Sequence, residues 1–249
     1  MEAIYDQIGT GYTVTRCTDP KIEAQIKSEL VNAKNIVNIG AGTGSYEPEG
    51  VNLVAVEPSI EMINQRSPCS YPVKQAKADK LPFPDNYFSH AMTVLSMHHW
   101  ENRQQAFDEI KRVTTTRFIA ITWLPDSAPF WLTRDYFPEI YEIDRQIFPS
   151  IHELKKSFKN IEVKPLLIPD DCEDGFLACF WKRPEAYLHK NVRSAISTFS
   201  KITKLELGLE KLKNDLTTGV WNKRNAGLLN KSYIDVGYRI VSVDLSMSV

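Results

Sequence analysis

The segment IVNIGAGTG, Ile36–Gly44, is an apolar run that ends in three glycines at alternate positions. A short apolar run bounded by a glycine-rich turn is typical of a buried strand. Glycines at this point let the backbone come close to a ligand, because no Cβ atoms stand in the way. Such turns also close strands for purely structural reasons, and an NAD site begins in a similar way. The segment therefore indicates an α/β fold with a nucleotide site, without identifying the nucleotide.

Strand and helix patterns alternate on both sides of this turn. Asp19–Val31 is predicted to be helical, since apolar residues recur at helical spacing behind a capping aspartate and a proline. Strands alternating with helices imply a parallel, doubly wound sheet. Five strands are predicted, at Asn35–Ile39, Asn52–Glu57, Pro72–Ala76, Phe88–Ser96 and Arg117–Trp123, with helical or turn-rich segments at Ser59–Gln65 and Asn102–Val113.

The pattern changes after Trp123. Leu124–Ser150 is rich in aromatic residues and prolines, and Ser150 is placed to cap a short helix that runs to Phe158. A strand at Ile161–Ile168, a mostly helical stretch at Pro169–Lys231 and a last strand at Val236–Val243 follow. We therefore expect a mainly helical lid, inserted after the fifth strand and between the last two strands.

Composition narrows the class of protein. Thirty Lys and Arg residues against 31 Asp and Glu residues give a net charge of −1, so a global basic field for nucleic acid is absent. The longest apolar stretches are far shorter than the roughly 20 residues that span a bilayer. The start, MEAIYDQIGTGY, does not read as a signal peptide, so a cytoplasmic protein is expected. Four scattered cysteines without a CxxC pair argue against a disulfide framework and against a metal site.

Two acidic residues follow the next two predicted strands. Glu57 comes 13 positions after Gly44 and ends the second strand, where its carboxylate could accept both hydroxyls of a ribose. Asp79 follows the third strand, at the edge where open α/β sheets bind their ligands. The glycine turn, Glu57 and Asp79 together suit an adenosine. A dinucleotide site would use the first two and leave Asp79 without a role.

The segments NIGAGTG, VEPS and KADKLPFPDNYFSHAMTVLSMHHW resemble the class I S-adenosylmethionine-dependent methyltransferases, in particular the group that includes the ubiquinone/menaquinone-biosynthesis enzymes. The resemblance covers roughly Asn35–Trp123. It implies a Rossmann-like, seven-stranded, mostly parallel sheet whose last strand is antiparallel, with S-adenosylmethionine as cofactor and S-adenosylhomocysteine as product. It also implies which residues bind the cofactor: Gly40, Ala41, Gly42 and Gly44 at its methionine part, Glu57 and Pro58 at the ribose, Asp79 with the backbone of Lys80 and Leu81 at the adenine, and Leu95 beside them.

Two departures from the family pattern concern the glycine turn. Asn38 stands where the family usually has an acidic residue, so it brings no charge to the ammonium group of the cofactor. Only SYEPEG separates Gly44 from Val51, which leaves room for little more than one helical turn and a weaker helix dipole. An N-terminal group, Tyr5, Tyr12 or Arg16, is expected to compensate by closing over the cofactor; surface or packing roles are the alternative.

The histidines offer candidates for proton transfer. His98 and His99 follow the fourth strand and face the expected substrate region, where either could accept a proton from a nucleophile. The alternative is that HHW is only a recurrent feature at this strand end. His90 is expected to pack inside the strand, and His152 could reach the site from its helix.

The resemblance predicts a methyltransferase that transfers the methyl group to an O, N or C nucleophile of a small molecule by in-line displacement. In such a reaction, correct alignment of the two reactants supplies much of the rate. Residues 1–124 would form the cofactor-binding core with an N-terminal cap, 125–150 and 169–232 the lid, and 151–168 and 233–249 the rest of the core. The alternatives are a tRNA or protein methyltransferase, a non-catalytic cofactor-binding module and an NAD-dependent oxidoreductase.

Overall fold

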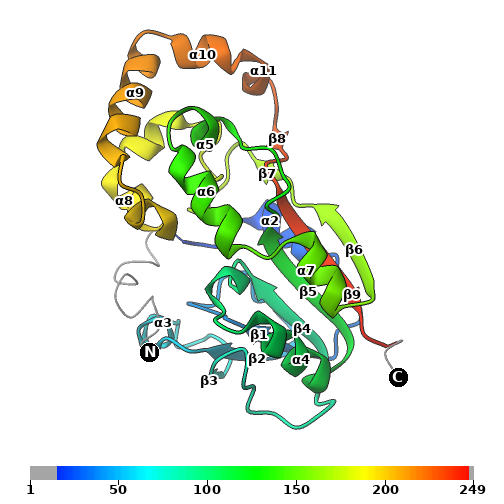
Figure 1. Ribbon diagram of the computed structural model, residues 1–249. Coiled ribbons are helices and arrows are strands. Elements are labelled where there is room, and N and C mark those ends of the chain that lie inside the picture. The colour runs from blue at the N-terminus through cyan, green and yellow to red at the C-terminus, as the bar shows by residue number, and fades with distance from the viewer. Residues whose placement is uncertain (1–15, 247–249) are drawn as a thin grey trace.

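A seven-stranded sheet forms the centre of the computed structural model, which describes residues 16–246 (Figure 1). The strand order is β3-β2-β1-β4-β5-β9-β6, and β9 runs antiparallel to both of its neighbours. The other pairs, from β3 to β5, are parallel, so the predicted fold class is confirmed. The strands are β1 (Asn35–Ile39), β2 (Asn52–Glu57), β3 (Val73–Gln75), β4 (Phe88–Val94), β5 (Thr114–Trp123), β6 (Asn160–Pro165) and β9 (Tyr238–Asp244).

Helices cover both faces of this sheet. α2 (Pro20–Lys27) buries Ile22 and Ile26 against one face, and its N-cap Asp19 accepts hydrogen bonds from two backbone N–H groups. α4 (Arg103–Val113) and α7 (Ile151–Ser157) pack on the other face, capped by Asn102 and Ser150. The short α3 (Ile60–Asn64) follows β2 and is capped by Ser59. The predicted helices are thus present, and α2 ends four residues before Val31.

The predicted strand at Ile161–Ile168 is wrong in its last three residues. β6 ends at Pro165, and the Leu166 N–H makes one more hydrogen bond to β9, to the Tyr238 carbonyl at 2.9 Å. The chain then leaves the main sheet, and β7 (Ile168–Pro169) pairs with β8 (Tyr233–Ile234) in a separate two-stranded sheet. Periodicity along the sequence cannot show this change of partner, because both pieces have the same apolar character.

Helices also fill the two insertions, which share a hydrophobic core of their own around Trp131, Tyr187 and Trp221. In Figure 1 they lie together beyond the end of the sheet at which β5 stops. That they act as a lid remains a prediction. The elements are α5 (Trp131–Asp135), α6 (Pro138–Ile147), η3 (Pro184–Leu188), α8 (Lys190–Ser194), η4 (Ser197–Ser200), α9 (Leu205–Thr217), α10 (Val220–Arg224) and α11 (Ala226–Leu229).

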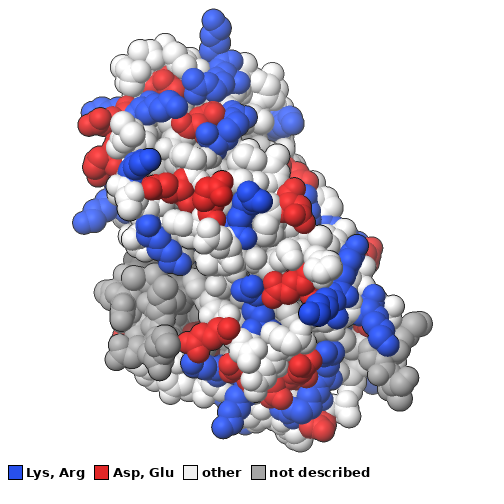
Figure 2. Space-filling model, viewed as in Figure 1, with Lys and Arg blue, Asp and Glu red and all other residues white. Residues whose placement is uncertain are grey.

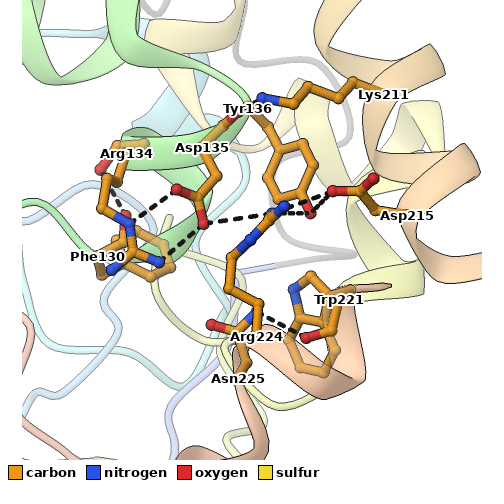
Figure 3. Close-up of polar contacts among 10 residues, drawn as sticks. Phe130, Arg134, Asp135, Tyr136, Lys211, Asp215, Trp221, Arg224 and Asn225 are labelled. Atoms are coloured by element: carbon orange, nitrogen blue, oxygen red, sulfur yellow. Dashed lines mark hydrogen bonds and ion pairs between the residues drawn. The ribbon is translucent and has the colours of Figure 1, made fainter. Parts of the chain in front are cut away.

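A polar cluster around the buried Asp215 joins the two insertions (Figure 3). Asp215 on α9 is 7% exposed and accepts hydrogen bonds from the Tyr136 hydroxyl at 2.8 Å and from Arg224 Nη1 at 3.0 Å. Burial, with the adjacent Asp215, raises the pKa of Tyr136, which keeps its hydroxyl protonated. Segments 79 residues apart in the chain are thereby held as one unit. None of the helices in residues 16–246 combines the length and apolar character needed to cross a membrane.

Candidate functional site

A cavity of about 500 Å³ opens where β1, β2 and β4 end, a volume typical of small-molecule sites. Loops that follow these strands form much of its wall, as expected for an open α/β sheet. The structure brings ten of the predicted site residues together in its lining: Arg16, Gly40, Ala41, Gly42, Glu57, Pro58, Asp79, Leu95, His98 and His99.

Three predicted residues are not among the described lining of this cavity. The Leu81 N–H donates to Glu109 Oε2 at 2.7 Å, and the Leu81 carbonyl accepts from Arg112. The Lys80 N–H donates to the Lys77 carbonyl, and the Gly44 N–H to the Ala41 carbonyl. These N–H groups are therefore already bonded within the protein: the Leu81 N–H to a side chain of α4, the Lys80 N–H within its own turn and the Gly44 N–H within the glycine loop. Tyr5 and Tyr12 lie outside the described residues.

The glycines of the loop serve different purposes. Both Gly40 and Gly42 have positive φ angles, 68° and 53°, which favour glycine. A Cβ atom on Gly40 would lie 1.8 Å from Ser96 Oγ, whereas one on Gly42 would have no heavy atom within 4 Å. The fold therefore needs glycine at position 40 to pack against the turn after β4. At position 42 the missing side chain leaves space at the cavity.

A Gly40→Ala variant is expected to lose about 2–4 kcal/mol of unfolding free energy, because a steric clash adds to the cost of the left-handed backbone. Gly42→Ala is expected to lose only about 1–2 kcal/mol, from the backbone conformation alone. Urea unfolding of both variants measures the difference. Equal losses would show that the contact with Ser96 does not constrain the loop.

Glu57 ties the end of β2 to the glycine loop. Its side chain is buried, and its carboxylate accepts hydrogen bonds from Gly42 N–H at 2.8 Å and Ser59 N–H at 2.9 Å. A carboxylate has about four acceptor positions, and the binding of a ribose by Glu57 remains a prediction. Asp79 lies at the cavity wall as well, with no hydrogen-bond or ion-pair partner in the part of the chain that the structure describes.

A buried ion pair stands where the family has a helix after the glycine loop. Residues 40–51 form turns and no helix, which is less than the single helical turn that the sequence left room for. Glu47 pairs with Arg66 at 2.7 Å, and the two side chains are 5% and 3% exposed. Arg66 Nη1 also donates to the Gly42 carbonyl, and Asn38 Nδ2 donates to Glu47. Burial raises the pKa of Glu47, although Arg66 and Asn38 lower it. Sequence reasoning missed this pair, since no motif or spacing links its members.

The segment before α2 reaches the cavity through Arg16. Its guanidinium pairs with the fully buried Asp174 at 2.7 Å, and the same carboxylate accepts the Tyr46 hydroxyl at 2.8 Å. The Tyr46 N–H donates to Thr18 Oγ1, which joins this segment to the loop after β1. Arg16 therefore lies where an N-terminal group was expected, and its role toward a cofactor remains a prediction. Asp174, in the second insertion, was missed.

His98 and His99 lie in the 3₁₀ helix η2 (Met97–His99), with ring centroids 3.8 Å apart. His98 also stacks on Phe148 from the first insertion at 4.2 Å. Burial, with the positive charges of Lys201 and Arg16, lowers the pKa of His99 to about 4. Burial and the neighbouring His99 lower the pKa of His98 well below its ordinary value. Both imidazoles are neutral at pH 7 and can accept hydrogen bonds, but they are weak bases.

The pKa of His99 predicts a pH dependence of stability. Below about pH 6.5 the unfolded chain binds a proton at this residue before the folded protein does, so stability falls until the pH reaches about 4. Between pH 7 and pH 5 the wild type is expected to lose about 1–2 kcal/mol more than a His99→Gln variant. Urea unfolding at both pH values tests this, and equal losses would contradict it. Asp144, whose pKa burial raises to about 6, acts in the opposite direction, but it is present in both proteins.

Comparisons with known proteins identify the family. A family model described as a methyltransferase domain matches residues 37–117. The 2-methyl-6-phytyl-1,4-hydroquinone methyltransferase 2 of Oryza sativa is 25% identical over 181 residues, 66% of this chain and 50% of that protein. The chain thus spans about half the length of this curated relative.

Solved structures extend the comparison to the whole fold. A candidate methyltransferase from an antibiotic biosynthesis pathway of Anabaena variabilis is 32% identical with a TM-score of 0.83, and the match covers 92% of this chain and 98% of that one. Geranyl diphosphate C-methyltransferase of Streptomyces coelicolor, solved with S-adenosyl-L-homocysteine, has a TM-score of 0.50 at 13% identity. That match covers 89% of this chain and 74% of the other, and it shows a shared fold.

Proposed function

Because this chain belongs to the S-adenosylmethionine-dependent methyltransferases, we propose that it transfers a methyl group from S-adenosylmethionine to an O, N or C nucleophile of a small molecule. One observation carries the proposal: a single cavity joins Glu57 and Asp79, suited to an adenosine, with the histidines and Lys201 beyond β4. A cofactor and an acceptor can therefore share one enclosed space.

The residues at the cavity fit this cofactor. Asn38 Oδ1 is a buried acceptor without a hydrogen-bond partner among the described residues, and the ammonium group of the cofactor would satisfy it. Asp79 is free to accept from the adenine amino group, and the Glu57 carboxylate at the end of β2 would accept the ribose hydroxyls. Arg16 is placed to meet a carboxylate. When bound, the cofactor supplies an electrophilic methyl group on a positively charged sulfur.

The residues of this chain then have the task of alignment. Holding two reactants in line can supply much of the rate of a displacement without any acid or base. The loop between Gly40 and Gly44 would orient the methionine part, and the turn after β4 would orient the acceptor. His99, neutral at pH 7, can accept a hydrogen bond from the nucleophile, although its low pKa makes it a poor acceptor of a full proton.

Calorimetry with S-adenosylhomocysteine tests the cofactor, and NADH serves as the control ligand. Binding of S-adenosylhomocysteine alone is expected; binding of NADH alone would overturn the proposal. Incubation with methyl-labelled S-adenosylmethionine and a metabolite extract then tests the reaction. The label is expected in a small molecule that is one methyl group heavier than its precursor. Binding without any transfer would instead indicate a non-catalytic module.

A small acceptor is proposed rather than a nucleic acid. On the face shown in Figure 2, Lys and Arg side chains alternate with Asp and Glu, and the net charge is −1. A continuous basic surface for phosphates is not seen on this face. Label recovered in tRNA or in protein would contradict this part of the proposal. A cytoplasmic location is also proposed, and the four free cysteines of the described chain support it.

A further inference from the structure

Lys201 differs from the other basic residues at the cavity. Arg16 is paired with Asp174 at 2.7 Å, and Lys77 with Glu101 at 3.0 Å. Lys201 lines the same cavity and has neither an ion pair nor a hydrogen bond from its side chain to any of residues 16–246. Its side chain is exposed, so the ammonium group is available to a ligand.

Lys201 lies at the end of the cavity where we expect the methyl-accepting substrate to bind. It lines the cavity together with His98 and His99, which follow β4, and its charge lowers the pKa of both histidines. Asp79, the free carboxylate, follows β3, and the sheet order β3-β2-β1-β4 puts three strand spacings between these ends. Three spacings amount to roughly 14 Å. The cavity thus has a free anion at its nucleoside end and a free cation at the other end.

The chain on both sides of Lys201 is anchored to α6. Upstream, Thr198 Oγ1 donates to the buried Asp144 at 2.8 Å. Downstream, the N–H groups of Thr203 and Lys204 donate to Glu139 at 3.0 and 2.9 Å. The backbone that carries Lys201 is therefore fixed before any ligand binds. This lowers the entropy cost of binding a ligand to the Lys201 side chain.

We propose that the methyl-accepting substrate is an organic anion whose carboxylate binds the Lys201 ammonium. The inference rests on the proposed function and identifies the class of its substrate. The rings of His98 and His99 are neutral at pH 7. The carboxyl group of Asp144 interacts with Lys201, whose charge lowers its pKa, but it is buried and already accepts a hydrogen bond from Thr198. The exposed ammonium group of Lys201 can therefore still attract an incoming carboxylate. S-adenosylmethionine has a carboxylate of its own, and the experiment separates the two sources.

The test uses benzoate and benzamide, which have similar shapes and differ in charge. Binding is measured by calorimetry or ligand-observed NMR at millimolar concentrations, with and without S-adenosylhomocysteine. Wild-type protein is expected to prefer benzoate by roughly three- to tenfold, as for a partly exposed ion pair. Lys201→Gln should lose the preference, and Lys201→Arg should keep most of it. Lys204→Gln, an exposed lysine outside the cavity in the same segment, is the matched control and should behave as wild type.

The experimental results that would contradict the proposal can be told apart from one another. A wild type that does not prefer benzoate, or a preference that survives in Lys201→Gln, removes Lys201 as an anion site for the acceptor. If Lys201→Gln weakens S-adenosylhomocysteine but not 5′-methylthioadenosine, which lacks the carboxylate, Lys201 serves the cofactor instead. Failure of the wild type to bind S-adenosylhomocysteine at all would refute the proposed function, while the comparison without cofactor still tests the anion site.

Discussion

A Glu57→Ala variant is expected to bind S-adenosylhomocysteine at least about 30-fold more weakly than the wild type, which corresponds to about 2 kcal/mol. The carboxylate would be lost as an acceptor for the ribose hydroxyls. In addition, Gly42 N–H and Ser59 N–H would lose their acceptor, and the glycine loop would no longer be tied to β2. Both effects lower the affinity for S-adenosylhomocysteine.

Calorimetry of Glu57→Ala beside Glu49→Ala measures this effect. Glu49 is exposed and lies in the segment between β1 and β2, outside the cavity lining, so its replacement removes an equal charge without touching the cavity. Circular dichroism checks that both variants are folded. Unchanged affinity in a folded Glu57→Ala protein would remove Glu57 from the cofactor site.

An Arg66→Met variant is expected to lose about 3–5 kcal/mol of stability, because Glu47 would remain buried without its cation. For a chain of this size the loss corresponds to a fall in Tm of roughly 6–20 °C. The pKa of Glu47, already raised by burial, would rise further without Arg66. The variant should therefore be relatively more stable at acidic pH, where Glu47 is protonated, and lose that stability as the pH rises.

The double variant Glu47→Gln/Arg66→Met provides the control. It buries no unpaired charge, so it is expected to be more stable than Arg66→Met alone. Thermal unfolding of the wild type, of Glu47→Gln, of Arg66→Met and of the double variant gives the coupling energy of the pair. Strictly additive losses would mean that the two side chains do not stabilise the loop as a pair.

Most of the cavity lining that we propose for the nucleoside could be predicted from the sequence. Gly40, Gly42 and Asp79 follow predicted strands and Glu57 ends one, and parallel strands bring their carboxyl ends to one edge. The backbone expected at Leu81 does not reach the cavity, because Glu109 on α4 takes its N–H group. A sequence motif indicates which residue stands at a position. It does not show which other groups of the folded protein will form hydrogen bonds with the backbone of that residue.

Sequence alone determined what depends on local order: the apolar strands, the caps at Asp19 and Ser150, the glycine turn and the antiparallel last strand that the family resemblance implies. Tertiary structure decided the rest. Arg16 meets Asp174 across 158 residues, and Lys201 reaches the cavity only because α6 holds its segment there. Periodicity and caps act within a few residues, whereas charge pairing depends on distance in space, which only the folded chain defines.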